Sequence, residues 1–442
     1  MSKLKKYILI IDYNLSRYDD VKMMAEYALS KYGLRAILIR PNPSSIDQLV
    51  ADHIINLDPR SEGFIEDAIR CLSSFANDIQ AGLVFSDNAV FSGAKLLESL
   101  GLETDSALMA ESAYSKIKYR QAESENINLW NKQNIFVPNF KVIYTLDEVI
   151  EFSQNNPNGF VLKPACEGNN RGVMLLREGD NLDEALSSIM PYLKDGLICE
   201  ELIQFEEEYS FDGISHLTFI TKKLSKKSKY PVEYGQIVSG EMDTRTAELI
   251  ARAGAVANMI VGQCRGPFHN EIKLSLEKDQ AAIIEPNRRP AGMKIWSLAE
   301  KVFGYDFYQL WIDRVVAKKL PSKLPPAKGV SAIRMLGAPC DGVFKLPVYL
   351  SNNSDLLFKK FIEQFKKHSH VAFPIEWFGF QLNKKTGDDV VKVQKDNSDF
   401  IAQICIYLND SRVDVIQLLD QINDCWLDYI SVYVQSQRGE AA

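Results

Sequence analysis

The sequence predicts a protein of mixed α/β and α+β class with about three domains. Its 442 residues exceed the roughly 250–300 residues at which a single hydrophobic core stops growing. Strand-type and helical segments alternate up to about residue 110, whereas strand-type runs joined by polar loops dominate the segment 111–320. A segment rich in proline and lysine, 320–328, precedes a last α+β unit. We therefore predict domains at 1–110, 111–320 and 321–442.

The first domain carries the pattern of a doubly wound parallel sheet. Strand-type runs alternate with helical segments, which is typical of βαβ units with right-handed crossovers. No GxGxxG motif follows the first strand, where Asp12-Tyr13-Asn14 stands instead, so no dinucleotide is assigned to this domain. The strands are expected at 7–12, 36–39, 53–57 and 83–85, and the helices at 20–32, 46–50, 64–75 and 91–100.

The middle segment changes to an antiparallel pattern after a polar helix at 110–125. We expect an α+β lid at about 140–210, then a polar loop at 222–229 and a long helix at 244–261. The last unit ends in an amphipathic helix at 413–431, whose apolar side fits core packing or a dimer partner. The strands are expected at 140–143, 159–163, 172–176, 197–202, 208–214, 234–238, 269–276 and 281–285.

Composition and charge exclude several classes of protein. The formal net charge of −7 argues against nucleic acid as the main partner. No apolar run approaches the roughly 20 residues of a membrane span, and no signal segment is recognised. The seven cysteines form no CxxC pair, so we expect reduced thiols in a soluble, cytoplasmic protein rather than disulfides or a zinc site. The basic run 222–229 lacks interleaved aromatic residues, so a solvated loop is favoured over a polyanion site, the alternative being lysines that reach bound phosphates.

Polar side chains crowd the end of the strand predicted at 281–285. Glu285, Asn287 and Arg289 alternate along the chain and so point to one face. Glu271 would face Glu285 if the two neighbouring strands pair as a hairpin. Two carboxylates and an amide oxygen suit a hard divalent cation, and the guanidinium suits a phosphate. The alternative is a cluster of Glu and Arg that neutralises itself at a strand end.

A glycine-containing loop joins the strands predicted at 159–163 and 172–176. Lys163 stands at its base, and Gly168 and Gly172 leave backbone N–H groups accessible to phosphates. The alternative is an ordinary Gly/Asn hairpin. The loop does not match GxxxxGK[ST], so a P-loop is excluded.

The strand predicted at 197–202 leads into a segment suited to a nucleoside. Backbone groups of Glu201, Leu202 and Ile203 are placed to bond an adenine edge, and Glu208 to accept from ribose hydroxyls. The alternative for Glu208 is one more surface carboxylate in an acidic run.

Together and in this order, these motifs resemble the ATP-grasp superfamily over about residues 1–320. The family's early basic motif, Asp-Lys followed by Arg, is matched by Lys116 and Arg120, with Ser115 in place of Asp. The resemblance implies ATP and Mg²⁺ as cofactors, with Mn²⁺ as a substitute. Arg171 and Ala291 depart from the family pattern. The resemblance therefore does not define the shape of the acceptor pocket. The implied roles are phosphate contact by Lys116 and Lys163, metal ligation by Glu271, Glu285 and Asn287, and phosphate stabilisation by Arg289.

Within the superfamily, the motifs at 266–271 and 285–292 look most like those of the L-amino-acid ligases. That likeness implies joining of two amino acids, or of an amino acid and another amine, through an acylphosphate. His269 and Arg288 are candidate substrate contacts, although His269 also fits a hydrogen-bonded, partly buried histidine. A homodimer is a further expectation.

The sequence leaves two alternative functions open. The first is a biotin-carboxylase-like or purine-pathway ATP-grasp enzyme. A phosphorylated substrate would need cationic side chains in the N-terminal domain. Few such residues are found there besides Arg17, Lys22, Arg35 and Arg40. The second is a catalytically silent nucleotide-binding subunit, which would not need the metal ligands and Arg289.

Overall fold

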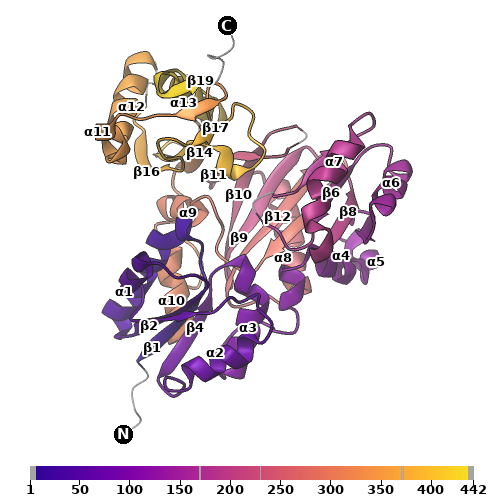
Figure 1. Ribbon diagram of the computed structural model, residues 1–442, viewed down its shortest axis with the longest axis vertical. Helices are drawn as coiled ribbons and strands as arrows, with labels where there is room; N and C mark the ends of the chain where they lie inside the picture. The colour runs from indigo at the N-terminus through magenta and orange to yellow at the C-terminus, as the bar shows by residue number, and fades with distance from the viewer. Residues whose placement is uncertain (1–5, 169–170, 229, 370, 372, 437–442) are drawn as a thin grey trace.

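The computed structural model describes residues 6–168, 171–228, 230–369, 371 and 373–436. Asn169 and Asn170 of the glycine loop and Lys229 of the basic run lie outside these residues. Figure 1 shows an N-terminal unit in indigo, a lid in magenta and a C-terminal unit in yellow around a long central sheet. No helix within the described ranges is both long and apolar enough to cross a membrane.

The N-terminal unit is a parallel sheet of order β3-β2-β1-β4 with helices on both faces, as predicted. Alternate residues of β1 enter opposite cores, because side chains along a strand point to opposite faces. Ile8 and Ile10 pack on the side of α1 and α10, whereas Leu9 and Ile11 pack on the side of α2 and α3. The elements are β1 (Tyr7–Ile11), β2 (Arg35–Arg40), β3 (His53–Asn56), β4 (Ile79–Val84), α1 (Tyr18–Tyr32), α2 (Phe64–Leu72), α3 (Val90–Ser99) and α10 (Phe307–Ala317). The segment predicted as a helix at 46–50 is a 3₁₀ turn, Ser45–Leu49.

The lid is a four-stranded antiparallel sheet of order β5-β8-β6-β7 packed on two helices. Its strands are β5 (Phe140–Ile143), β6 (Phe160–Pro164), β7 (Met174–Leu176) and β8 (Leu197–Glu201), and its helices are α6 (Leu146–Asn155) and α7 (Leu182–Ile189). Helix α6 is missing from the sequence prediction. Thr145 and Glu148 form a capping box at its start, and this Thr-x-x-Glu spacing is a sequence signal for a helix N-terminus.

The central sheet has eight strands in the order β13-β12-β9-β10-β11-β14-β18-β16. Helix α8 (Thr244–Ile260) packs against β9, β12 and β13. The short helices α4 (Lys116–Ser124) and α5 (Ile127–Asn131) lead from the N-terminal unit to β5 of the lid, and β8 of the lid leads into β9 of the central sheet. The strands are β9 (Glu207–Ile214), β10 (Leu217–Ser225), β11 (Glu233–Ser239), β12 (Pro267–Ser275), β13 (Gln280–Asn287), β14 (Val330–Leu336), β16 (Glu376–Leu382) and β18 (Ala402–Leu408).

The polar loop predicted at 222–229 is wrong in its first residues. Lys222 and Lys223 continue β10, and the ladder to β9 and β11 includes both. Phe219, Thr221 and Lys223 are all buried, so the period-two pattern of the strand extends through a lysine. Lys223 tolerates burial because it lies between Glu233 of β11 and Glu271 of β12.

The last unit is joined to the rest by main-chain pairing, since β14 pairs with β11 and extends the central sheet into β18 and β16. The domain division at residue 320 therefore precedes a strand of a shared sheet, and it stays a prediction. Leu419, Ile422 and Trp426 of the predicted amphipathic helix lie in the core of this unit. Its other elements are α11 (Val348–Ser351), α12 (Ser354–His368), α13 (Val415–Ile430), β15 (Gly342–Phe344), β17 (Asp389–Val390) and β19 (Val434–Ser436). Helix α9 (Ile295–Phe303) precedes this unit and packs in the core shared with α1 and α10.

Candidate functional site

The predicted hairpin of β12 and β13 places the candidate metal ligands side by side. Glu271 pairs directly with Glu285, and His269 pairs with Asn287. Residues that face each other across an antiparallel pair, or stand two apart along one strand, share a face of the sheet. Strand β13 lies at the edge of the sheet, a position that tolerates Pro286, which has no N–H to donate. The four polar side chains therefore share one face.

Two lysines from other elements neutralise this carboxylate pair. Lys116, the first residue of α4, places its Nζ 3.0 Å from Glu285 Oε1 and donates to the Glu167 carbonyl at 2.7 Å. Lys223 of β10 places its Nζ 2.8 Å from Glu271 Oε1. Burial opposes the charge on Glu271, but Lys223 and His269 outweigh it and hold the pKa of Glu271 well below its usual range. Burial also opposes the charge on Lys116, yet Glu285 raises its pKa.

His269 is buried and fully engaged by carboxylates. Its Nδ1 lies 2.6 Å from Asp212 Oδ1, and its Nε2 lies 3.4 Å from Glu271 Oε1. Asp212 also accepts from Ser210 Oγ at 2.6 Å and from Thr221 Oγ1 at 2.7 Å. Burial lowers the pKa of His269, but the Asp212 carboxylate more than reverses this and raises it to about 9. The hydrogen-bonded interpretation of this residue fits the geometry, and the imidazole helps to orient Glu271.

Lys163, at the base of the glycine loop, is held by a buried network. Its Nζ lies 2.8 Å from Glu200 Oε1, and Arg120 binds the other oxygen of Glu200 at 3.0 Å. Arg120 also pairs with Glu123 at 2.5 Å and donates to the Ile283 carbonyl at 3.0 Å. Burial opposes the charge on Glu200, but Arg120 and Lys163 lower its pKa to about 2. The arginine of the early basic motif therefore positions Lys163 and strand β13.

We expect Glu200→Gln to lower the free energy of unfolding by about 3 kcal/mol at pH 7, because two buried cations lose their shared carboxylate. A carboxylate whose pKa is depressed by folding contributes stability above its unfolded value, here near 4.5, and loses it as the pH falls toward 2. The difference between variant and wild type should therefore shrink below pH 4.5 in urea unfolding. Glu201→Gln is the matched control, with a loss below about 1 kcal/mol. A difference that is constant with pH would contradict the network.

A cavity between the lid and the central sheet gathers most of the predicted nucleotide-binding residues. Its lining includes the predicted residues Lys116, Lys163, Glu201, Leu202, Ile203, Glu208, Glu271 and Glu285. The Glu201 carboxylate turns to the Asn139 amide nitrogen, 3.0 Å away, so the backbone of this segment is the part suited to a base edge. Glu208 accepts from Ser225 and lies 3.0 Å from Lys273 Nζ.

A second cavity continues from the first toward the N-terminal unit. The two cavities share Lys116, Val173, Glu233, Glu271 and Glu285. The second one is also lined by His269, Asn287, Arg289 and Gly168, and by Asn14, Ser16, Asp87 and Asn88 of the N-terminal unit. Asp87 is absent from the sequence prediction. It follows β4 at the carboxyl edge of a parallel sheet, where ligands of such sheets bind, and this position is the signal that would have found it.

Arg289 projects into the second cavity from just beyond β13. Its Nε donates to Asp87 Oδ1. Burial opposes the charge on Arg289, but Asp87 raises its pKa, so the guanidinium stays cationic. Gly172 of the glycine loop has φ +70°, and a Cβ there would lie 2.8 Å from Pro164 Cγ, so glycine is required at this turn.

The chain is similar to known ligases both in sequence and in backbone structure. No family model matches the chain. It is 26% identical over 299 residues, 62% of its length, to an alanine–anticapsin ligase from Bacillus subtilis. The chain spans about 60% of the length of the curated relatives it matches. Its backbone superposes on an L-amino acid ligase from Bacillus licheniformis with a TM-score of 0.74 at 16% identity, covering 96% of this chain and 98% of that one.

The chain has the ATP-grasp fold. An N5-carboxyaminoimidazole synthetase from Staphylococcus aureus, solved in complex with ADP, is also similar, with a TM-score of 0.64 at 15% identity over 95% of this chain and 98% of that one. The predicted fold class and the predicted resemblance to L-amino-acid ligases are thus confirmed.

The donor set of the hairpin formed by β12 and β13 fits a hard divalent cation. The part of the chain that the structure describes contains no group of three His, Cys, Asp or Glu side chains that would hold a metal unaided. Glu271, Glu285 and Asn287 offer two carboxylates and one amide oxygen. Mg²⁺ usually binds through one or two carboxylates and takes its other ligands from phosphate and water, so these residues fit it.

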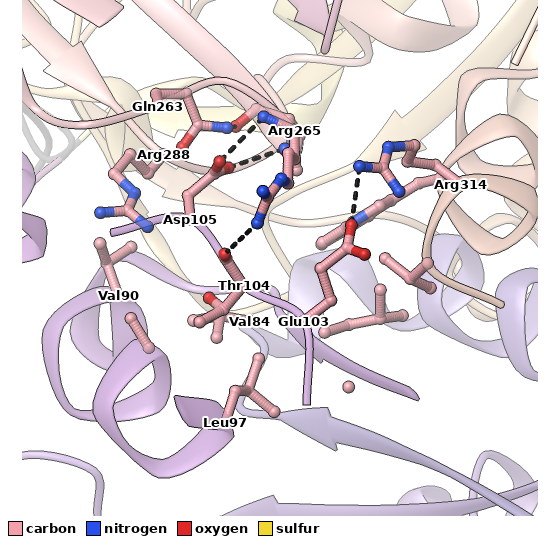
Figure 2. A pocket seen from close by; sticks show the side chains of 17 residues that line it. Val84, Val90, Leu97, Glu103, Thr104, Asp105, Gln263, Arg265, Arg288 and Arg314 are labelled. Atoms are coloured by element: carbon pink, nitrogen blue, oxygen red, sulfur yellow. Dashed lines mark hydrogen bonds and ion pairs between the residues drawn. The ribbon is translucent and has the colours of Figure 1, made fainter. Parts of the chain in front are cut away.

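Arg288 lies apart from the other predicted site residues of the ATP-grasp fold. Figure 2 shows it in a separate cavity beside Asp105 and Arg265. Its Nη1 donates to the Ser106 carbonyl at 2.6 Å and to the Val261 carbonyl at 3.2 Å, and burial lowers its pKa. Because neighbouring residues of an extended chain point to opposite faces, Arg288 turns away from the cavity that Arg289 enters. The structure thus does not bring Arg288 together with the other predicted site residues, and its role as a substrate contact stays a prediction.

Proposed function

We propose that the protein is an ATP-dependent carboxylate–amine ligase. It would join two amino acids, or an amino acid and another amine, through an acylphosphate and release ADP and phosphate. The observation that carries this proposal is the pair of cavities that meet at Lys116, Glu271 and Glu285. A triphosphate in the first cavity would present its γ-phosphate at that junction, and a carboxylate substrate in the second would meet it there.

The side chains at the junction suit phosphoryl transfer to a carboxylate. Bound Mg²⁺, held by Glu271, Glu285 and Asn287, would supply charge neutralisation for the phosphates. Lys116 and Lys163 would contact phosphate oxygens from the two sides of the nucleotide. Arg289 would stabilise the negative charge that develops on the transferring group, an electrostatic contribution worth several kcal/mol. Closure of the glycine loop would keep water from the acylphosphate until the amine attacks its carbonyl carbon and phosphate leaves.

The N-terminal unit favours an unphosphorylated substrate over the purine-pathway alternative. The four cations singled out there from the sequence all have a carboxylate partner: Arg17 pairs with Asp20, Lys22 with Glu26, Arg35 with Asp52 and Arg40 with Asp47. None of these four cations lines the second cavity as the structure describes it. Arg17 is further occupied by the Ala291 carbonyl at 3.0 Å and the Tyr308 hydroxyl at 2.8 Å. Among the described residues, the N-terminal unit contributes no cation to the lining of this cavity that a phosphoribosyl group would meet.

Phosphate release from ATP and Mg²⁺ tests the proposal, with amino acids supplied singly and in pairs and the product identified by mass. We expect turnover that requires two amino acids, or an amino acid and an amine, and a product one water lighter than the sum of the two. Turnover with bicarbonate or with a phosphoribosyl amine instead would favour the alternative ATP-grasp chemistry. Nucleotide binding with no turnover on any of these substrates would favour the silent subunit.

A further inference from the structure

Asp87 is a carboxylate of the second cavity to which the proposed chemistry gives no role. It begins the 3₁₀ turn Asp87–Ala89 between β4 and α3. Its side chain is 38% exposed. Among the described residues that line this cavity, it is the carboxylate that comes from the N-terminal unit, and its neighbours there, Asn14, Ser16 and Asn88, are uncharged.

The other carboxylates of this cavity keep a cation in the proposed reaction. Glu233 and Glu271 share Lys223, and Glu167 has Arg171 at 2.8 Å. Glu285 pairs with Lys116 and would also hold Mg²⁺ when Lys116 contacts phosphate. Asp87 differs because its partner is Arg289, the guanidinium that phosphate oxygens would engage. Once Arg289 turns to phosphate, Asp87 needs another cation.

The second oxygen of Asp87 is placed to receive that cation. Arg289 binds Oδ1, and no hydrogen bond or ion pair to Oδ2 is found among the described residues. Oδ2 faces the glycine loop, since a Cβ built on Gly168 would lie 3.8 Å from it. The Asp87 carboxylate thus has Arg289 on Oδ1 and the glycine loop on the side of Oδ2, and both of these line the cavity proposed for the carboxylate substrate.

We propose that Asp87 binds the α-ammonium group of the amino acid whose carboxyl group is activated. This assignment rests on the proposed function. The ammonium is attached to the carbon next to the carboxyl group, so a carboxyl group near Arg289 brings the ammonium within reach of Asp87. An ammonium at Oδ2 would restore the charge balance of the aspartate, and the uncharged neighbours would not compete for it. Asp87 would then distinguish amino acids from simple carboxylic acids.

Two substrates that differ only in the amino group distinguish binding of the ammonium by Asp87 from a role in which Asp87 only positions Arg289. The two substrates are the amino acid with the highest turnover in the panel and the carboxylic acid that lacks only its amino group. Hydroxylamine serves as the common nucleophile, and hydroxamate and ADP are measured. Any effect of Asp87 through Arg289 is the same for both substrates, because both are phosphorylated at the same carboxyl group. That effect therefore cancels in the ratio of their kcat/KM values.

We expect the wild type to prefer the amino acid by about 10- to 100-fold, the range for a charge-assisted hydrogen bond. Asp87→Asn should reduce this preference to about threefold or less, mainly by raising KM for the amino acid. Asp87→Ser should give the same loss of preference. This second variant is used in place of Asp87→Asn if thermal unfolding shows that Asp87→Asn does not fold. Glu167→Gln, which removes another carboxylate of the same cavity, should keep the wild-type preference.

Three results would overturn the assignment. An unchanged preference in both Asp87 variants, with turnover lowered alike for both substrates, would leave Asp87 as a positioning residue for Arg289. An equal loss of preference in Glu167→Gln would indicate a general charge effect. No hydroxamate from the unmodified protein with any amino acid would contradict the proposed function itself, and the assignment would fall with it.

Discussion

Glu285→Gln should abolish Mg²⁺-dependent ADP formation and leave the protein folded. We expect a loss of at least about 100-fold in turnover, because the amide replaces a charged oxygen ligand where phosphate charge must be neutralised. Stability should change little, since the Glu285 side chain is 30% exposed and the variant keeps its shape. Lys116 loses an ion pair at 3.0 Å but retains the Glu167 carbonyl.

The measurement is steady-state ADP formation across Mg²⁺ concentrations, together with thermal unfolding. Glu277→Gln is the matched control, because Glu277 is exposed at the turn of the same hairpin, and it should leave both quantities at the wild-type value. If Glu285→Gln kept more than about a tenth of the activity, the metal assignment would be wrong.

Arg289→Ala should lower turnover far more than it weakens nucleotide binding. The guanidinium would act mainly on charge that develops during phosphoryl transfer, and removal of one such group costs about 10²–10³ in kcat. KM for ATP should change by no more than a few-fold, because Arg289 lines the second cavity and is absent from the residues that line the first. The side chain holds no backbone group of another element among the described residues, so loss of fold is not expected to cause the effect.

Arg289→Lys is the informative partner to this variant. It keeps the positive charge but lacks the planar fork of donors, so it should recover part of kcat and still fall well below wild type. The measurements are kcat and KM for ATP and for the activated amino acid. Equal losses in kcat and in ATP affinity would indicate ground-state binding and would remove the proposed role in the transition state.

Much of the site was predictable from the sequence because its residues follow strand periodicity. Glu285 and Asn287 are two apart on β13, and the sequence places this strand in a hairpin with β12. The turn sets a register that pairs Ile272 with Ile283, and a β-bulge between Glu271 and Ile272 then shifts the register so that Glu271 faces Glu285. The hairpin was therefore predictable from local pattern, whereas the bulge that aligns the two carboxylates was not. The N-terminal βαβ order was predictable for the same reason, since local alternation determines it.

Charged residues in the interior were not predictable from local pattern. Lys223 stands in a run of lysines that predicts a solvated loop. It is buried nevertheless, because Glu233 of the next strand and Glu271 of β12, 48 residues further along the chain, both pair with it. Arg120 likewise belongs to a polar helix, and its burial depends on Glu200 of the lid. Burial of a charge is decided by partners that only folding supplies, so a single sequence carries little signal for it.

The amino-acid order alone determined the alternating α/β start, the carboxylate hairpin and the glycine loop, because each of these follows from residues that are close together in the chain. Tertiary structure alone decided that Asp87 meets Arg289 across 202 positions of sequence, that Arg288 points elsewhere, and that two cavities open onto one junction. The physical reason is that such contacts depend on how separate sheets pack, which no local periodicity encodes.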